Sequence, residues 1–512
     1  MLVSIAMFAI FRPLFIRFMA PDDFARRRNL WLFVVAASFL APNIWLYVLV
    51  TVPALLYVGK RDPNPVAVYL LVLVAVPPFQ VEIPTFGLIG RVFPLDHALF
   101  ISLALLLPIL IRRGGEGAAA SGGVKAAAGN PTRAVDFLVL AFLGLQLVLV
   151  LPYDSPTMVA RRVVLMFIDV ALPYFAIRRA CRTRDSIAEA MAAFVMAMVV
   201  LAPLALLEFA KGWMLFAGIG EQWNAVRLYF PLYRGSFLRA QTTAGHSIFM
   251  GYFVAIGFGM WLYLQRRVHV GKAMSWLCTL TLVASLVVPL ARGPWAGAAG
   301  ILFVHVVLAP NPVARTFKTL ALVGTIFCVA LFSPWGSEVI DYLPFIGTVD
   351  DQTVIYREQL AKGSWLLIQQ HPFFGSPYFL SQMEEFRTGE GIIDIVNTYA
   401  TIALAFGLVG AGVFLAVFLA AIRQTYQLSR RLQSIDPDAS RMGIALIACI
   451  VGTLIVLATT SFLHAMPYLV WALVGMTSAY VRLGAEASPQ NQSSAHLDGI
   501  EPLRDGRPTW SH

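Results

Sequence analysis

The sequence predicts an all-α membrane protein whose chain crosses a lipid bilayer many times. Its 512 residues are 59% hydrophobic and only 13% charged, and the mean hydropathy is +0.74. A soluble domain could not bury so much apolar surface. Apolar runs of about 15 to 25 residues recur along the chain, each long enough to cross about 30 Å of hydrocarbon as a helix. Runs of this length indicate helices rather than a β-barrel.

About 14 spans are expected, in a range of about 12 to 14 that the amino-terminal end leaves open. They lie near residues 30–41, 43–58, 66–80, 96–112, 134–152, 163–178, 187–210, 247–264, 273–290, 295–309, 316–333, 393–421, 441–463 and 466–482. The first two are short and are separated only by Pro42 and Asn43, so they form a shallow hairpin or one broken helix. In that case residues 1–18 supply a further crossing.

The spans divide the chain into regions. Residues 1–28 form an interfacial segment, which is not a cleaved signal peptide because it lacks a basic start and contains Arg12 and Arg17. The other regions are transmembrane helices at 29–333 with an external loop at 211–246, a large and partly helical external loop at 334–392, the last three spans at 393–483, and a disordered cytoplasmic tail at 484–512.

Basic residues give the orientation. Lys and Arg fall on alternate loops, near residues 26–28, 60–61, 112–133, 178–184, 266–272, 315–318 and 423–441. Because cationic loops stay in the cytoplasm, both termini are expected there, and the loops at 211–246 and 334–392 lie on the external face. Most of the net charge of +10 then comes from basic residues that set the orientation in the membrane, so we expect no nucleic acid partner.

No pattern in the sequence indicates a metal or a nucleotide cofactor. Internal repeats, phosphate-binding loops and ligand spacings of His and Cys are absent. Residues 114–129 form a small-residue linker that we expect to be disordered. Four cysteines in spans or a cytoplasmic loop are interpreted as packing residues: Cys181, Cys278, Cys328 and Cys449. Catalytic and substrate-binding residues are therefore expected in the external loops.

The loop at 211–246 is rich in arginine and runs into the next span as FLRAQTTAGHSIFMGYF. Arg239 and His246 flank a polar turn at the start of that span, where a phosphate would meet a guanidinium and free helix amides. Alternatively, Arg239 anchors the loop at the level of the lipid head groups. The same anchoring role is an alternative for Arg227 and Arg234.

Arg292 is a further external arginine, in the short turn 291–294 between two apolar spans. A guanidinium beside hydrocarbon is costly unless it reaches the interface or binds an anion. Both alternatives remain open for this residue.

The large loop predicts a helix over 352–370 that ends before His371. Arg357 is expected on its buried face, with a distant carboxylate or a phosphate as partner. The apolar stripe that contains Arg357 consists of Val354, Ala361, Trp365 and Ile368. Arg357 and His371 are about 21 Å apart along the helix, too far for one small site. His371 either serves the chemistry or caps the helix.

Residues 392–410, IIDIVNTYATIALAFGLVG, open an apolar span with a polar cluster. Asp394 shares a helix face with Asn397 and Thr401 by spacings of three and four residues. Tyr399 lies in the same cluster. Asp394 either reaches a vestibule at the mouth of the span or caps the helix.

Four segments together resemble the superfamily of O-antigen ligases and Wzy-type polysaccharide polymerases. In chain order they are FLRAQTTAGHSIFMGYF, LARGPWAGAAG, YREQLAKGSWLLIQQHPFFG and NTYATIALAFGLVG. The resemblance covers roughly residues 200–480 and implies a glycosyltransferase of the bacterial inner membrane that acts at the periplasmic face without metal or cofactor. Its implied partners are a glycan on undecaprenyl diphosphate, the lipid bilayer and other polysaccharide-assembly membrane proteins.

The chain departs from the ligase pattern at one position. O-antigen ligases place a histidine, implicated as the catalytic base, directly before the asparagine that matches Asn397. Here Asn397, Gly407 and Gly410 keep the spacing, but Val396 stands in the histidine position and cannot take up a proton. The candidate replacements, in order, are Asp394, His371 and His246. The two glycines are interpreted as sites of close helix packing.

The resemblance also assigns roles to the remaining residues. Arg239, Arg292 and Arg357 would stabilise the departing diphosphate. A base would help an acceptor hydroxyl to attack. Substrate positioning falls to Asn397, Tyr399 and Thr401, and a candidate lid contains Glu384, Glu385 and Glu390.

The missing histidine favours a polymerase that joins repeat units of an exopolysaccharide, capsule or O-antigen. The alternative is a ligase that transfers the glycan to lipid A core. A transporter of lipid-linked sugars is the contrasting class, and it predicts paired ionisable residues within spans. Asp169 and Glu208 are the only acids well inside, and neither has an obvious partner in the sequence, so an enzyme is preferred.

Overall fold

The computed structural model describes residues 1–82, 94–111, 131–225, 230–268, 271–309, 351–387 and 393–486. These parts are almost entirely helical, as predicted. Two short hairpins provide the strands of the described residues: β1 (Val81–Glu82) with β2 (Pro94–Leu95), and β3 (Tyr233–Arg234) with β4 (Phe237–Leu238).

Six of the described helices are long and apolar enough to cross a membrane. They are α3 (Ile44–Arg61), α7 (Arg133–Val150), α10 (Arg184–Lys211), α12 (Ser247–Arg267), α18 (Thr398–Leu432) and α19 (Pro437–Leu457). The protein is therefore a helical membrane protein. The count of about 14 spans stays a prediction, and the expected span at 316–333 lies outside the described residues.

The other helices complete the bundle. They are α1 (Leu2–Phe15), α2 (Pro21–Leu40), α4 (Pro65–Val72), α5 (His97–Ile101), α6 (Leu107–Ile111), α8 (Pro156–Met166), α9 (Leu172–Ala180), α11 (Ala217–Gln222), α13 (Lys272–Val287), α14 (Arg292–Val307), α17 (Asp351–Gln370) and α20 (Met466–Glu486). One π-helical turn, η1 (Ser102–Leu106), joins α5 to α6, and another, η2 (Phe167–Ala171), joins α8 to α9. Two 3-10 turns, η3 (Phe379–Gln382) and η4 (Glu384–Phe386), follow α17.

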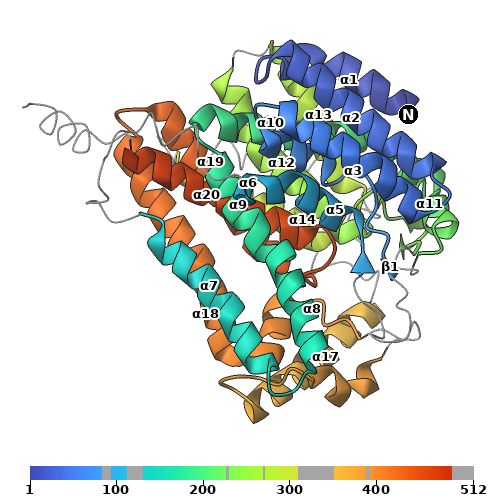
Figure 1. Cartoon of the computed structure of the whole chain (residues 1–512), viewed down its shortest axis with the longest axis vertical. Helices are drawn as coiled ribbons and strands as arrows, with labels where there is room; N and C mark the ends of the chain where they lie inside the picture. Colours follow the sequence, from blue (N-terminus) through green and yellow to red (C-terminus); the bar gives the residue numbers. More distant parts are fainter. Residues whose placement is uncertain are drawn as a thin grey trace, which may run out of the picture.

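The bundle surrounds α12, of which 94% of the apolar window is buried, against 22% for α7. Helix α12 contacts α10, α13, α14 and α19, while α7 packs along α18 on the outside of the bundle (Figure 1). An almost fully buried α12 is hydrophobic on all sides, as expected of a helix in the centre of a bundle.

Two predictions for the amino-terminal part are wrong. Helix α2 begins at Pro21, so residues 26–28 lie in a helix and not in a loop. Arg27 is fully buried there, with its guanidinium 2.6 Å from the carboxylate of Asp62 and 2.8 Å from that of Glu189. Two opposite charges compensate the cost of removing Arg27 from water. The expected segment boundary at residue 28 therefore falls inside a helix.

The expected span at 66–80 is the second error. Its helix, α4, ends at Val72, although the chain stays buried through Val76. Pro77 and Pro78 cannot donate backbone hydrogen bonds, so a helix does not continue through them. The carbonyl group of Val74 instead accepts a hydrogen bond from the hydroxyl of Thr243, at 2.5 Å.

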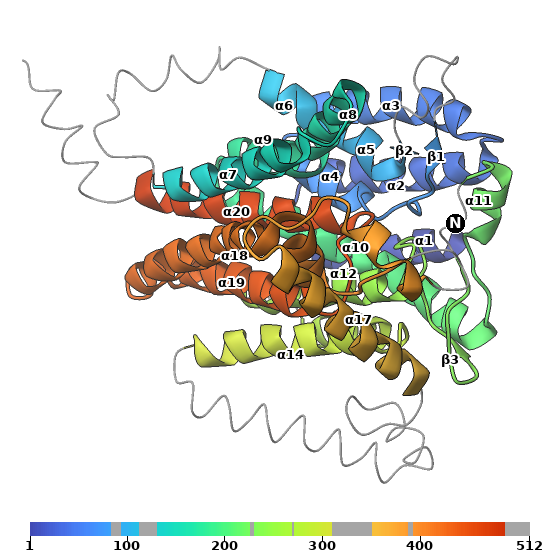
Figure 2. The ribbon, with the colours of Figure 1, turned by 90° about the horizontal axis from the view of Figure 1, so that it is seen from below.

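The two loops that were predicted to be external share one end of the bundle. Figure 2 shows α11, β3 and α17 together at the right of the view.

Ion pairs join the ends of several helices. Arg267, in the last turn of α12, pairs with Asp185 in α10 and with Asp438 in α19. Arg482, near the end of α20, donates a hydrogen bond to the carbonyl group of Cys181 after α9. Basic residues at helix carboxyl ends are also favoured by the helix dipole.

Helix α18 contains a sharp kink. Gly407 has φ 68° and ψ −175°, which interrupts the helical hydrogen bonds. The turn after α17 supplies replacements: the amide of Leu408 donates to Pro372, and the amide of Ser376 donates to Leu404. A Cβ atom on Gly407 would overlap the carbonyl group of Phe373. The prediction of close helix packing at Gly407 is therefore wrong, because its close partner is the backbone of a loop.

Candidate active site

Three helix starts meet the loop between α19 and α20, residues 458–465. Gly293, in the first turn of α14, packs directly on Thr459. The hydroxyl of Thr398, the first residue of α18, donates to the carbonyl group of Thr460 at 2.7 Å. Near the start of α12, the ring of Phe249 packs on His464 of this loop. This loop is thus the common neighbour of the segments that carry the predicted site residues.

Arg239 lies beside the segment that leads to Arg292. Its Nε donates to the carbonyl group of Pro289 at 3.1 Å, and the next amide, of Ala240, donates to Val288 at 3.2 Å. Arg292 is the first residue of α14, where the sequence predicted a turn. Both arginines are half-buried. The structure therefore brings together the two segments that were expected to bind diphosphate.

Glu208 holds the polar turn between Arg239 and His246. Its buried carboxylate accepts hydrogen bonds from the amides of Gln241 at 3.0 Å, Thr242 at 2.8 Å and Leu215 at 3.1 Å. Thr242 has φ 46°, an unusual conformation for a non-glycine residue that these bonds stabilise. The sequence revealed no partner for Glu208, because its partners are backbone amides of a loop.

His246 caps α12, and this fixes the hydrogen bonding of its ring. Nδ1 accepts a hydrogen bond from the amide of Ile248 at 3.1 Å. Burial, with the positive charge of Arg239, lowers the pKa of His246 to about 3, and His464 and Arg357 act in the same direction. A neutral ring whose Nδ1 accepts must carry its proton on Nε2. His246 thus offers a hydrogen-bond donor, whereas the sequence analysis named it as a candidate base.

The predicted buried stripe of α17 is wrong at three positions, because Arg357, Ala361 and Trp365 are exposed. Ile368 is buried as predicted, and the residues buried with it are Leu360 and Ser364. The buried side faces a small core that includes Phe379, Met383 and Ile395. Arg357 therefore lies on the exposed side of α17, although it is near enough to lower the pKa of His246. The side chain of Val354 lies outside the described residues.

His371 lies at the other end of α17. It directly follows the last helical residue, as predicted, and its side chain is exposed. Its carbonyl group accepts a hydrogen bond from the amide of Gly375, which closes the turn. No contact of His371 with the segments of Arg239 or Asp394 appears in the described part of the chain.

Asp394 is held by the loop after α19. Its Oδ1 accepts hydrogen bonds from the hydroxyl of Ser461 and from the amide of Val396, the latter at 3.1 Å. The cap of α18 is Asn397, which accepts from the amides of Tyr399 at 3.0 Å and Ala400 at 3.1 Å. The alternative in which Asp394 caps this helix is therefore excluded.

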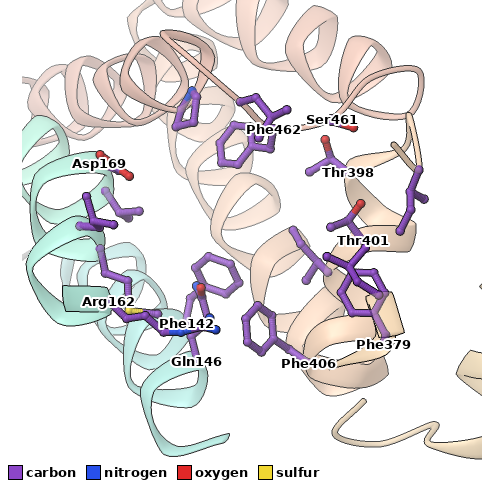
Figure 3. Close-up of a pocket in the computed structure, with 18 of the residues that line it drawn as sticks. Phe142, Gln146, Arg162, Asp169, Phe379, Thr398, Thr401, Phe406, Ser461 and Phe462 are labelled. Atoms are coloured by element: carbon purple, nitrogen blue, oxygen red, sulfur yellow. The ribbon is translucent and has the colours of Figure 1, made fainter. Parts of the chain in front are cut away.

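A cavity of about 480 Å³ opens beside Asp394, between the α7–η2 side and α18 (Figure 3). Most of its wall is apolar. Its polar lining residues are Gln146, Arg162, Asp169, Asp394, Thr398, Thr401 and Ser461. Tyr399 is not among the lining residues, and its hydroxyl donates to the carbonyl group of Leu454 at 2.7 Å. Of the three predicted positioning residues, only Thr401 lines this cavity.

The comparison with known families agrees with this geometry. A family model described as O-antigen ligase matches residues 273–415. This part of the chain, called the O-antigen ligase region below, is similar to that family. The O-antigen ligase region runs from α13 into α18 and contains Arg292, Arg357, His371 and Asp394. Arg239 and His246 lie before it. No curated protein matches the chain.

One histidine that the sequence analysis overlooked lies beyond the O-antigen ligase region. His464 packs its ring on Phe249 at 5.4 Å between centroids, and Phe249 is also 5.4 Å from His246. Burial lowers the pKa of His464 to about 4. Its Nδ1 is enclosed and has no hydrogen-bond partner in the described parts of the chain. The sequence feature that could have pointed to His464 is its place in a short loop on the predicted external face.

Several predictions fall outside the described residues, namely those for Arg227, Cys328, Glu390, the linker at 114–129 and most of the tail at 484–512. Glu384 and Glu385 form part of η4, and Glu384 pairs with Arg387 at 2.6 Å. The other three cysteines are buried and unpaired. Among the described residues, no group of three His, Cys, Asp or Glu side chains is arranged to hold a metal.

Proposed function

We propose that this protein is a membrane glycosyltransferase that polymerises glycan repeat units carried on undecaprenyl diphosphate at the periplasmic face. The product would be an exopolysaccharide, a capsule or an O-antigen. The observation that carries the proposal is the position of the α19–α20 loop. Its Thr459 touches the start of α14 with Arg292, and its Ser461 binds Asp394 at the cavity. A donor diphosphate and an acceptor hydroxyl would thus be held on either side of one loop.

On the donor side, cationic and N–H donor groups would stabilise the leaving group. As the bond between the anomeric carbon and the diphosphate oxygen breaks, negative charge grows on that oxygen. Arg239 and Arg292 offer planar guanidinium groups that match phosphate oxygens. The Nε2–H group of His246 would add a neutral donor, and Arg357 a more distant positive charge.

On the acceptor side, Asp394 would act as the base. Its carboxylate would take the hydroxyl proton while the acceptor oxygen bonds to the anomeric carbon and the diphosphate leaves with the electron pair. The hydrogen bonds from Ser461 and Val396 both reach Oδ1, which orients the carboxylate. Asp394 would thus serve in place of the histidine that is absent at Val396.

The transporter alternative receives less support. Glu208 accepts hydrogen bonds from three backbone amides, so its carboxyl group holds the polar turn instead of carrying a moving ion. A ligase that uses lipid A core as acceptor remains the closer alternative, because it needs the same donor chemistry.

A transfer assay with purified protein in nanodiscs tests the proposal. The substrate is the lipid-linked repeat unit extracted from a strain that lacks the gene. Wild type should form longer lipid-linked chains, and Arg239→Ala, Arg292→Ala and Asp394→Asn should each lower the rate by at least about 10²-fold. Lys362→Ala is the control, since this exposed lysine of the large loop pairs with Glu358 on the surface of α17.

The glycans of the deletion strain separate the two closest functions. A polymerase leaves single repeat units when it is lost, whereas a ligase leaves long chains that are not attached to lipid A core. Full activity of both arginine variants would overturn the diphosphate site.

A further inference from the structure

The cavity beside Asp394 contains a second carboxylate that the proposed reaction does not use. Asp169, in η2, lines it on the wall opposite Thr398, Thr401 and Ser461 (Figure 3). The hydroxyl of Tyr468, in α20, donates to Oδ1 of Asp169 at 2.5 Å. The sequence analysis considered Asp169 only as a coupling residue of a transporter. Its position in the same cavity as Asp394 indicates another role.

The lining of this cavity has the composition of a sugar-binding site. Aromatic rings of Phe142, Phe379, Phe406 and Phe462 form much of the wall, and the polar groups are carboxylates, hydroxyls, one amide and one guanidinium. Aromatic faces pack against the C–H faces of a pyranose, while carboxylates and hydroxyls bind its hydroxyl groups. The volume of about 480 Å³ lies within the usual range for small-molecule sites.

The charges of the cavity restrict what it accepts. Arg162 is the one basic side chain among the lining residues, and its Nε lies 2.7 Å from the carboxylate of Asp154. The hydroxyl of Tyr378 donates to the same carboxylate at 2.8 Å, so Arg162 belongs to a link between the large loop and α8. Asp169 and Asp394 are the acidic side chains among the lining residues. An anionic sugar would lie beside these two acidic side chains and against a largely apolar wall, where an ionised group is poorly solvated.

We propose that this cavity is the acceptor site, that it takes a neutral sugar in preference to a uronic acid, and that Asp169 determines this specificity. Asp169 accepts a hydrogen bond from a sugar hydroxyl remote from the one that reacts at Asp394. This inference rests on the proposed function, because it names the acceptor of the same reaction.

Binding of short-chain glycosides to the protein in nanodiscs tests the inference. The probes are butyl glucoside, butyl galactoside and butyl mannoside, with butyl glucuronide and butyl galacturonide as their acidic counterparts. Wild type should bind at least one neutral glycoside at least tenfold more tightly than its acidic counterpart. Asp169→Asn should abolish this preference, and in the transfer assay it should raise the acceptor KM about tenfold with little change in kcat.

A second measurement uses the wild type alone, in case Asp169→Asn does not fold. A neutral butyl glycoside that carries a diazirine should cross-link to residues 142–170, 379–380, 393–406 or 461–467, which line the cavity. Cross-links confined to other regions would overturn the assignment.

The outcomes separate the inference from the proposed function. Equal binding of neutral and acidic probes by wild type and Asp169→Asn, with transfer intact, overturns the inference alone. Absence of transfer by wild type overturns the proposed function. A loss of proton-driven sugar export in Asp169→Asn, without an effect on transfer, overturns the inference in favour of a transport role.

Discussion

At the scale of single residues, His246 links the cap of a helix to the chemistry of the site. Its Nδ1 accepts a hydrogen bond from the amide of Ile248, so the proton of the neutral ring is on Nε2, which can donate. The sequence showed a histidine beside an arginine at a helix start, and nothing in that pattern tells which ring nitrogen is occupied. The cap geometry, which depends on the fold of the preceding turn, decides between donor and base.

His246 predicts a dependence of stability on acid pH. Its folded pKa of about 3 is below the ordinary value near 6.5, so the unfolded chain binds more protons between these values. The resulting stabilisation is complete above pH 6.5 and is lost as the pH falls towards 3. Thermal unfolding in detergent should therefore shift to lower temperature between pH 7 and 4, and His246→Asn should reduce that shift. His371→Asn, at an exposed histidine, is the control. An equal shift in wild type and His246→Asn would contradict the prediction.

Val396 predicts a stabilising substitution. It has φ 50°, a conformation that a β-branched side chain disfavours and that asparagine tolerates. Val396→Asn should therefore raise the free energy of unfolding by about 1 kcal/mol, measured as a higher Tm in detergent. A lower Tm would show that packing of the valine outweighs backbone strain.

At the scale of elements, sequence periodicity predicted the length of α17 but not its buried face. The expected range of 352–370 differs by one residue from the observed helix. Apolar residues occur on several sides of it, and Trp365 and Leu366 are exposed while Leu360 is buried. Periodicity cannot select a face when a helix has apolar residues on more than one side, so the contacts with η3 and α18 decide.

The kink of α18 predicts an unusually large effect of one methyl group. An alanine at Gly407 would need φ near 68° and would overlap the carbonyl group of Phe373. Gly407→Ala should lower stability by more than about 3 kcal/mol, measured by unfolding in detergent. Gly412→Ala is the matched control in the same helix, because a Cβ atom there meets nothing within 4 Å. Similar stability of the two variants would show that the turn after α17 does not depend on Gly407.

At the scale of the whole molecule, the distribution of basic residues predicted an orientation that labelling can test. Tyr233 is 57% exposed in the loop at 211–246, and Ile435 is 75% exposed between α18 and α19. In a background with Cys328→Ser, Tyr233→Cys should react with an impermeant maleimide in intact spheroplasts, and Ile435→Cys only after permeabilisation. The native Cys181, Cys278 and Cys449 are buried and should stay unlabelled. Labelling of Ile435→Cys in intact spheroplasts would reverse the orientation.

By itself, the sequence determined that this is a helical membrane protein, where most of its helices run, and that arginine-bearing loops meet polar helix starts. These properties follow from composition, run length and charge, which act locally along the chain. Only the tertiary structure decided that Glu208 binds backbone amides, that His246 is a donor, and that Asp169 faces the same cavity as Asp394. Such facts depend on contacts between segments far apart in the chain. The cavity draws its wall from residues 142–170, 379–406 and 461–467, and no local pattern encodes that they meet.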